Sequence, residues 1–283
     1  MSDRPARKGP QTHRAQVVHK ERLTPHMIRV VFGGEGLAAF ATGECTDHYV
    51  KLVFPLPDVD YPEPFDIGEV RATMPRAAWP RTRTYTVAGW DPEARRLTID
   101  FVHHGDEGLA GPWADAARPG DELYLLGPGG GYAPEPDADW HLLAGDEAAL
   151  PAIAAALAAL PAGARALAFI EVAGREEEQK LDYPEGPIEV VWLHREGRQV
   201  GEALVAAVTS AVFPPGEPQV FVHGEAHTVK ALRRHLRHDR QLPRDRMKSV
   251  SGYWRRGSDE DGWQSSKAEW NQRIEAEQEA AAG

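Results

Sequence analysis

A short stretch of the chain, residues 80–90, brings together a guanidinium, a phenol and several hydroxyls. Alternate residues of a strand share a face, so Arg83 and Tyr85 would point one way and Thr84 and Thr86 the other. A tyrosine ring can stack on a flat ligand ring, and a guanidinium donates paired hydrogen bonds to a phosphate. A flavin nucleotide has both parts, so this stretch predicts a flavin site. An ordinary solvated strand is the alternative.

A second stretch, residues 100–114, runs from a strand pattern through several glycines into a short helix pattern. Backbone N–H groups at the start of a helix bind anions, and glycines allow a pyrophosphate to approach the backbone closely. We interpret the stretch as a phosphate-binding turn. A plain turn followed by a helix cap is the alternative.

A third stretch, residues 144–152, follows the first strand pattern of the second half of the chain. This is the position at which a doubly wound sheet binds a dinucleotide. Asp146 and Glu147 replace the glycines that usually admit a pyrophosphate there. Capping of the next helix by these carboxylates is therefore a strong alternative.

The sequence also argues against a metal site and against a serine or cysteine catalytic triad. His223 and His227 flank Glu225, but the spacing and the start of the helix pattern do not match a zinc helix, so we predict no metal site. No serine or cysteine triad signature is present.

The elements that must position these residues fall into two groups. The first group consists of short strand patterns punctuated by turns, which is typical of an antiparallel barrel. We predict an antiparallel six-stranded β-barrel as a first domain over residues 15–133, with a long irregular excursion at 55–80. The expected strands are residues 15–19, 27–32, 48–54, 83–90, 97–102 and 121–126.

After the proline-rich residues 134–137, strand patterns alternate with helix patterns, which indicates a parallel sheet covered on both faces. We predict a doubly wound parallel α/β sheet as a second domain over residues 138–283, so the fold class is a two-domain α/β protein. A capping box at residues 266–269 predicts the start of a C-terminal helix. Trp263, Trp270 and Ile274 would pack this helix back on the protein. The expected strands are residues 140–144, 166–172, 188–193, 219–222 and 249–254.

The composition narrows the function classes. The 283 residues carry a formal net charge of −11, which argues against nucleic acid or an anionic membrane as the main partner. A single cysteine, Cys45, excludes an internal disulfide and a four-thiolate cluster. No run of about 18 apolar residues occurs and the polar start is not a signal peptide. We expect a soluble, cytoplasmic monomer with an unstructured tail at residues 1–14.

Four stretches, taken in order, resemble the siderophore-interacting protein family, the flavin-dependent ferric-siderophore reductases related to ferredoxin reductases. They are residues 83–86, residues 104–114, residues 145–152 and residues 251–257. The resemblance covers nearly the whole chain from Ala15 onward.

The resemblance implies FAD in the barrel domain, NADH or NADPH as electron donor, and a ferric siderophore as acceptor. It implies that Arg83 holds the FAD pyrophosphate, that Tyr85 stacks on the isoalloxazine and that Thr86 faces its reactive edge. Further flavin or nucleotide contacts would come from Val102, His103, His104, Gly108, Ala110, Gly111, Asp146 and Ala149. Two departures matter, because Gly111 replaces a usual serine and Ala148 a usual threonine.

The acceptor also needs cations, because ferric siderophores are bulky and often anionic. The resemblance places Lys51 beside the flavin, with Lys51 and Thr86 as the catalytic positions. A solvated lysine on the outside of a barrel strand is the alternative for Lys51. Surface charge is likewise the alternative for four C-terminal residues that would complete the site, namely Arg246, Lys248, Arg255 and Lys267.

The leading hypothesis is therefore a cytoplasmic NAD(P)H-dependent ferric-siderophore reductase that releases ferrous iron. A general flavin or ferredoxin-type reductase and a non-enzymatic siderophore-binding flavoprotein are the alternatives. Arg175, Arg195 and Arg198, the candidates for binding an adenosine 2′-phosphate, stand among glutamates. That neighbourhood favours NADH over NADPH.

Overall fold

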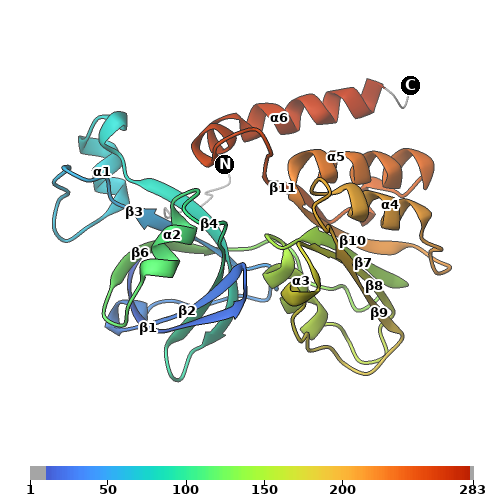
Figure 1. The fold of residues 1–283 in the computed structure, drawn as a ribbon, viewed down its shortest axis with the longest axis horizontal. Coiled ribbons are helices and arrows are strands. Elements are labelled where there is room, and N and C mark those ends of the chain that lie inside the picture. Colours follow the sequence, from blue (N-terminus) through green and yellow to red (C-terminus); the bar gives the residue numbers. More distant parts are fainter. Residues whose placement is uncertain (1–10, 281–283) are drawn as a thin grey trace, which may run out of the picture.

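Six strands of the amino-terminal half close into an antiparallel barrel (Figure 1). Their order around the barrel is β1-β2-β5-β4-β3-β6, and β6 closes the barrel by pairing with β1. The computed structural model describes residues 11–280. The strands are β1 (Thr12–Thr24), β2 (Met27–Gly33), β3 (Tyr49–Phe54), β4 (Arg81–Asp91), β5 (Arg96–Val102) and β6 (Glu122–Gly129). The predicted six-stranded barrel is confirmed.

Apolar residues that alternate with polar ones along the strands fill the barrel. Ala15 and Val17 of β1 and Val30 and Phe32 of β2 are almost completely buried, while their chain neighbours are more exposed. One end of this core is covered by helix α2 (Ala110–Ala116), whose Trp113 ring stacks on the Phe32 ring with centroids 6.0 Å apart. Burial of these side chains is the main favourable contribution to folding of the barrel.

The excursion between β3 and β4 is more ordered than predicted. It contains helix α1 (Ile67–Thr73) and a 3-10 turn, η2 (Arg76–Ala78), with another such turn, η1 (Glu35–Leu37), after β2. Asp66 caps α1 by accepting a hydrogen bond from Glu69 N. Ile67 and Val70 pack with Phe65 on the outer residues of β3 and β6. The sequence did not predict this helix, because seven residues are too few to show a clear helical periodicity and many prolines surround them.

The second half of the chain forms a five-stranded parallel sheet in the order β11-β10-β7-β8-β9 (Figure 1). Helix α3 packs on one face, while α4 and α5 pack on the other. The doubly wound sheet is therefore confirmed. Its strands are β7 (Trp140–Asp146), β8 (Ala166–Val172), β9 (Ile188–His194), β10 (Pro218–Glu225) and β11 (Ser249–Trp254). Its helices are α3 (Leu150–Ala158), α4 (Glu202–Ser210) and α5 (Ala226–Arg234), with short turns η3 (Arg175–Glu177), η4 (His235–Asp239) and η5 (Arg244–Arg246).

The last helix, α6 (Glu260–Ala280), begins earlier than predicted. Asp259 Oδ1 accepts a hydrogen bond from Gly262 N, whereas Ser266 Oγ donates to Gly262 O inside the helix. The motif at 266–269 is therefore not the cap, since a serine within a helix bonds back to the preceding turn. Trp263 and Ile274 are buried and hold α6 on the protein as expected.

The start of the chain also differs from its prediction. Residues 12–14 belong to β1 and pair with β6 instead of forming part of a tail. The rest of that tail, up to residue 10, lies outside the described residues. Within residues 11–280, no helix is long and apolar enough to cross a membrane.

Candidate flavin and nucleotide site

The register between β3 and β4 sets the predicted flavin residues on two faces. Tyr85 pairs with Val50 and Arg83 with Leu52, and these two barrel residues are completely buried. Residues directly opposite each other in an antiparallel pair share a face. Arg83 and Tyr85 therefore lie on the inner face of the barrel wall, as their alternation predicts.

The outer face of the same pair carries the other predicted side chains. Lys51 lies opposite Thr84, and Tyr49 lies opposite Thr86. Since Lys51 and Tyr49 are two residues apart, Lys51 and Thr86 are diagonal neighbours on one face. The structure brings together the two residues predicted as catalytic.

Arg83 is a buried cation with two carboxylate partners. Its side chain is 5% exposed. Its Nη1 donates to Asp261 Oδ1 at 2.7 Å, and its Nε lies against Glu260. Both partners come from the first turn of α6, and Asp261 also reaches Arg81 at 3.4 Å. Sequence reasoning missed these two carboxylates, because 178 residues separate Asp261 from Arg83.

Tyr85 packs into the barrel core with its ring tilted by 35° to that of Phe101. Its ring centroid lies 4.6 Å from that of Phe101, and the residue packs against the main barrel cluster. Burial raises the pKa of the Tyr85 phenol well above its usual value. The ring is therefore neutral and firmly held, which suits a stacking platform better than a proton donor.

The predicted phosphate-binding turn contains two glycines with left-handed backbone. Gly105 has φ +64° and Gly108 has φ +81°, a region that side chains other than glycine rarely adopt. A Cβ at either position would meet no atom within 4 Å, so the space above the turn is open to a ligand. The conformation and the open space fit a phosphate group.

Gly111 departs from the family pattern for a local reason. A Cβ at this position would lie 3.0 Å from the carbonyl oxygen of Val102, which is tighter than an ordinary contact. Both Gly111 and Ala110 are buried in the first turn of α2. A serine would therefore need Val102 to shift.

Of the two histidines of this turn, His104 faces the second domain. His103 N donates to the carbonyl oxygen of His26 at 2.9 Å, and His104 Nε2 lies 4.0 Å from Glu147 Oε1. Burial lowers the pKa of His104, and the Glu147 charge opposes that effect. His104 thus lies where the barrel meets the sheet, whereas the backbone bond of His103 stays within the barrel.

Asp146 ends β7 next to β10, where the strand order of the sheet reverses. Its Oδ2 accepts hydrogen bonds from Glu225 N at 2.8 Å and from Trp254 Nε1 at 2.9 Å, and its Oδ1 accepts from Ala148 N at 3.0 Å. The residue is 2% exposed, and burial raises its pKa to about 7. Asp146 therefore links the start of the β7–α3 connection to β10 and β11.

Small residues make this reversal possible. A Cβ at Gly145 would lie 2.5 Å from Ala149 Cβ, and one at Gly224 would lie 2.7 Å from the Asp146 carboxylate. Ala149 itself is completely buried. Like Asp146, Ala149 shapes the carboxyl edge of the sheet, which is the ligand-binding edge of such folds.

Glu147 and Arg195 form a paired group at the same edge. Two parallel hydrogen bonds join them, at 2.6 and 2.7 Å. Arg195 Nη1 also lies 3.7 Å from Glu171 Oε1. The guanidinium is thus already balanced by carboxylates, although these are not the glutamates that stand near the three arginines in the sequence.

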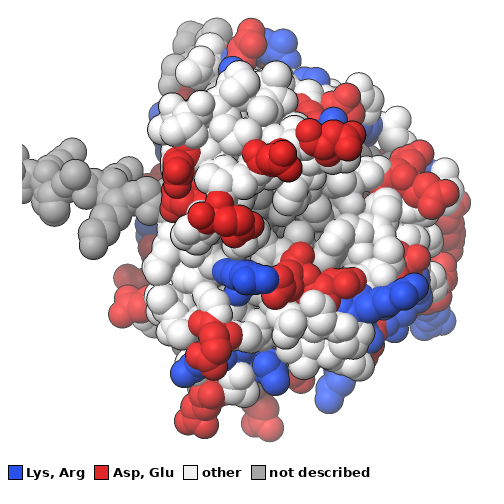
Figure 2. Space-filling view, turned by 90° about the vertical axis from the view of Figure 1, so that its left-hand side faces the viewer, with Lys and Arg blue, Asp and Glu red and all other residues white. Residues whose placement is uncertain are grey.

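Only one of the four C-terminal basic residues is shown close to Lys51. Burial lowers the pKa of Lys267 in α6, and the positive charge of Lys51 lowers it further, so the two charges act on each other. Figure 2, which faces the barrel end of the molecule, shows acidic groups spread over the surface with fewer basic ones. On this mainly acidic surface, Lys51 and Lys267 form a local region of positive charge.

Two of the remaining three basic residues lie away from Lys267. Arg246 pairs with Glu217 and Lys248 with Glu135, at the amino ends of β10 and β11 and away from the carboxyl edge of the sheet. Arg255 instead lies over two rings of α6, 5.5 Å from Trp263 and 5.4 Å from Trp270. The sheet separates Arg246 and Lys248 from Lys267 by the length of a strand, whereas Arg255 and Lys267 lie over the same Trp263 ring, with the Lys267 ammonium 6.0 Å from its centroid.

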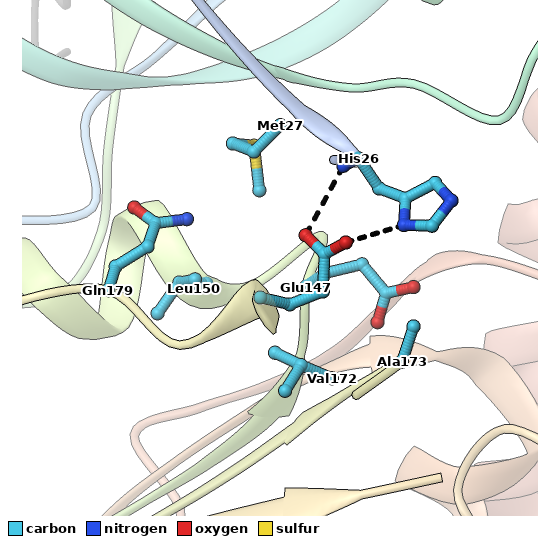
Figure 3. Close-up of a pocket in the computed structure, with 8 residues that line it drawn as sticks. His26, Met27, Glu147, Leu150, Val172, Ala173 and Gln179 are labelled. Atoms are coloured by element: carbon cyan, nitrogen blue, oxygen red, sulfur yellow. Dashed lines mark hydrogen bonds and ion pairs between the residues drawn. The ribbon is translucent and has the colours of Figure 1, made fainter. Parts of the chain in front are cut away.

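The two domains meet at a small pocket lined by Met27, His26, Glu147 and Glu177 (Figure 3). Glu177 Oε1 lies 2.5 Å from His26 Nδ1, and its Oε2 accepts hydrogen bonds from His26 N and Thr24 Oγ1. Sequence reasoning missed this joint, since no local pattern relates residues about 150 positions apart. Within the described chain, no group of three or more histidine, cysteine, aspartate or glutamate side chains could hold a metal ion.

Each half of the chain matches a known family of protein domains. The profile of the siderophore-interacting FAD-binding domain matches residues 16–132, and that of the siderophore-interacting protein matches residues 138–257. The ferric vibriobactin reductase ViuB of Vibrio cholerae is 33% identical over 260 residues, which are 88% of this chain and 92% of the relative. The chain belongs to the siderophore-interacting protein family.

Other relatives and solved structures agree with this assignment. The NADPH-dependent ferric-chelate reductase of Escherichia coli is 30% identical over 84% of this chain and 91% of its own. A siderophore utilization protein from T. fusca has a TM-score of 0.75 at 41% identity, covering 89% of this chain and 95% of that one. A ferredoxin reductase of carbazole 1,9a-dioxygenase shares the fold, with a TM-score of 0.64 at 17% identity over 86% of this chain and 70% of that one. The resemblance inferred from four short stretches is therefore confirmed.

Proposed function

We propose that this protein is an FAD-dependent oxidoreductase that reduces a ferric siderophore with electrons from a nicotinamide nucleotide. The observation that carries the proposal is the shared face of β3 and β4, which sets Lys51 beside Thr86 at the edge of the predicted flavin site. Relatives named as ferric reductases over most of their length support the reaction class.

The residues present fit FAD. Arg83 is the cation for the pyrophosphate, and the open turn at Gly105 and Gly108 offers backbone N–H groups to the same phosphates. Tyr85 supplies a rigid ring for the isoalloxazine, and Thr86 supplies a hydroxyl at its edge. When bound, FAD would accept a hydride and deliver single electrons.

Lys51 and Lys267 would recognise the acceptor. A ferric siderophore brings anionic oxygen ligands, and two neighbouring ammonium groups attract such a chelate more strongly than either alone. Docking it at this face would place the iron within reach of the flavin edge while the chelate keeps the metal coordinated. We propose that reduced iron then leaves the chelate in the cytoplasm.

We further propose NADH as the preferred donor. The pairing of Arg195 with Glu147 and Glu171 supports this choice, because an extra 2′-phosphate would have to displace a carboxylate. The E. coli relative is named for NADPH, so the two donors should be compared directly. A markedly lower Michaelis constant for NADPH in steady-state assays would overturn the preference.

The decisive experiment is anaerobic reduction followed by reoxidation. The protein is loaded with FAD, NADH is added and the flavin absorbance is followed. We expect the nucleotide to bleach the flavin and a ferric siderophore to restore its colour as iron is reduced. Bleaching without restoration by any ferric chelate would favour a general flavin or ferredoxin-type reductase. Absence of bleaching by both donors would favour a binding protein with structural FAD.

A further inference from the structure

The first turn of α6 lies on the arginine that FAD would need. Glu260 and Asp261 both contact the Arg83 guanidinium, and Asp261 also approaches Arg81. Asp259, the residue before them, caps the helix. The two contacting carboxylates are therefore not required for the cap, and their contacts with arginine need a separate explanation.

The charges around Arg83 cancel. Arg81 and Arg83 carry two positive charges, and Glu260 and Asp261 carry two negative ones. A pyrophosphate approaching this group meets no net attraction while the carboxylates stay in place, because their field opposes that of the arginines at short range. A guanidinium paired with carboxylates makes the same type of charge-assisted hydrogen bond that it would make with phosphate.

The contact also has a cost for the protein. Glu260 is partly withdrawn from water beside Arg83, and this burial raises the pKa of Glu260 against the opposing influence of the arginine. Because the carboxylate loses hydration, the Glu260–Arg83 ion pair stabilises the protein less than an exposed pair with the same geometry would.

The rest of α6 is attached independently. Trp263 is buried and its Nε1 donates to Tyr253 O at 2.8 Å, Ile274 is buried, and Lys230 of α5 pairs with Glu277. Glu260 and Asp261, at the start of the first turn, can therefore leave β4 while the helix from Trp263 onward stays on the second domain. Figure 1 shows α6 running from the β4 side of the barrel to a position over α5.

We propose that Glu260 and Asp261 act as an internal competitor for Arg83, so that FAD binding displaces the first turn of α6 from β4. The inference rests on the proposed function, since it takes Arg83 as the pyrophosphate site.

The test is FAD affinity of the full chain. Apo-protein is titrated with FAD at low salt for the wild type, Glu260→Gln, Asp261→Asn and the double variant. We expect the double variant to bind FAD about tenfold more tightly, in line with removal of charge-assisted contacts. Glu269→Gln, which removes an exposed charge from the same helix, is the matched control and should leave the affinity unchanged.

Other results of this titration would contradict the proposed competition. Weaker or unchanged FAD binding in the double variant would overturn the competition. An equal effect of Glu269→Gln would overturn it as well, because a distant charge would then suffice. Arg83→Ala separates this failure from that of the proposed function. If Arg83→Ala binds FAD as the wild type does, Arg83 is not the pyrophosphate site; if it binds weakly and the double variant does not improve, only the competition fails.

Hydrogen exchange gives a second measurement that does not depend on activity. Adding FAD to the wild type should speed amide exchange in residues 260–266 and leave residues 270–277 unchanged. Unchanged or slower exchange in residues 260–266 would contradict the displacement. Circular dichroism of each variant confirms that it is folded.

Discussion

At the scale of single residues, the buried ionisable groups of this protein are defined by partners on other elements. Arg83 is paired with α6, and Asp146 is hydrogen-bonded to β10 and β11. His223 lies between two rings, 4.3 Å from that of Phe221 and 4.6 Å from that of Tyr253. Lys51, by contrast, keeps its side chain exposed.

Lys51→Ala should therefore weaken binding of a ferric siderophore while FAD content stays normal. We expect a loss of roughly fivefold at low salt, because an exposed charge contributes up to about 1 kcal/mol, and a smaller loss at high salt because the wild-type attraction is screened. Lys51→Glu should be worse, since repulsion replaces attraction. Chelate titration by fluorescence quenching measures both. Lys180→Ala, an exposed lysine of the second domain, is the control, and equal affinities in all the proteins would return Lys51 to ordinary surface charge.

His223 should make the protein sensitive to acid. Burial lowers the pKa of His223 to about 3, so the unfolded state binds a proton below pH 6.5 that the folded state does not. Stability is then complete above pH 6.5 and falls as the pH decreases toward 3, by at most about 1.4 kcal/mol per pH unit from this group. His223→Phe, which keeps a ring between its neighbours, should flatten that slope in urea unfolding at pH 7, 6 and 5. A slope unchanged from wild type, or equally reduced in the exposed control His19→Gln, would contradict the assignment.

At the scale of elements, strand ends of the second domain are joined to helix starts by buried carboxylates. Glu171 at the end of β8 accepts hydrogen bonds from Gly201 N at 2.7 Å and from Leu204 N at 2.8 Å, at the start of α4. Glu225 at the end of β10 caps α5 through Thr228 N. These carboxylates satisfy N–H groups that have no partner within the helix.

Glu171→Ala should destabilise the protein by about 2–3 kcal/mol, because it leaves two buried N–H groups without acceptors. Glu171→Gln keeps one acceptor oxygen and should lose less. Urea unfolding followed by circular dichroism measures the difference. The exposed Glu189→Ala on β9 should stay within about 0.5 kcal/mol of wild type. A Glu171→Ala protein as stable as this control would show that α4 does not depend on the cap.

At the scale of the whole molecule, the joint at Glu177 fixes the barrel against the sheet. The Glu177 carboxylate is 5% exposed and contacts the turn between β1 and β2 through Thr24 and His26. The predicted flavin site lies on the barrel and the predicted nucleotide edge on the sheet. The placement of these two sites relative to each other therefore depends on this joint, because neither domain alone determines it.

Glu177→Ala should slow reduction of bound FAD by NADH about tenfold while FAD affinity changes less than twofold. Hydride transfer depends steeply on the placement of the reacting groups, whereas the FAD contacts lie within the barrel. Stopped-flow reduction under anaerobic conditions measures the rate, and Glu177→Gln should restore part of it. The neighbouring exposed residue provides a control, Glu176→Ala, with an expected rate equal to wild type. An unchanged rate in Glu177→Ala would show that the domains are held by other contacts.

Local patterns were sufficient to predict the six barrel strands, the alternating strands and helices of the sheet, and the two faces of β4. Alternation and helical periodicity are properties of neighbouring residues, so they can be read without knowing the fold. The same holds for the glycine turn at 105–108, whose left-handed backbone requires glycine. The family followed from four such stretches in order.

Other features were decided only by the tertiary structure. The start of α6 was misplaced because Ser266 forms its hydrogen bond inside the helix. Arg246 and Lys248 are close to Lys267 in the sequence, but a parallel strand carries the chain from one edge of the sheet to the other between them. The carboxylates on Arg83 and the joint at Glu177 connect residues more than 150 positions apart. Such contacts form only when separate elements pack, and no local pattern in the sequence records which distant charge will meet which partner.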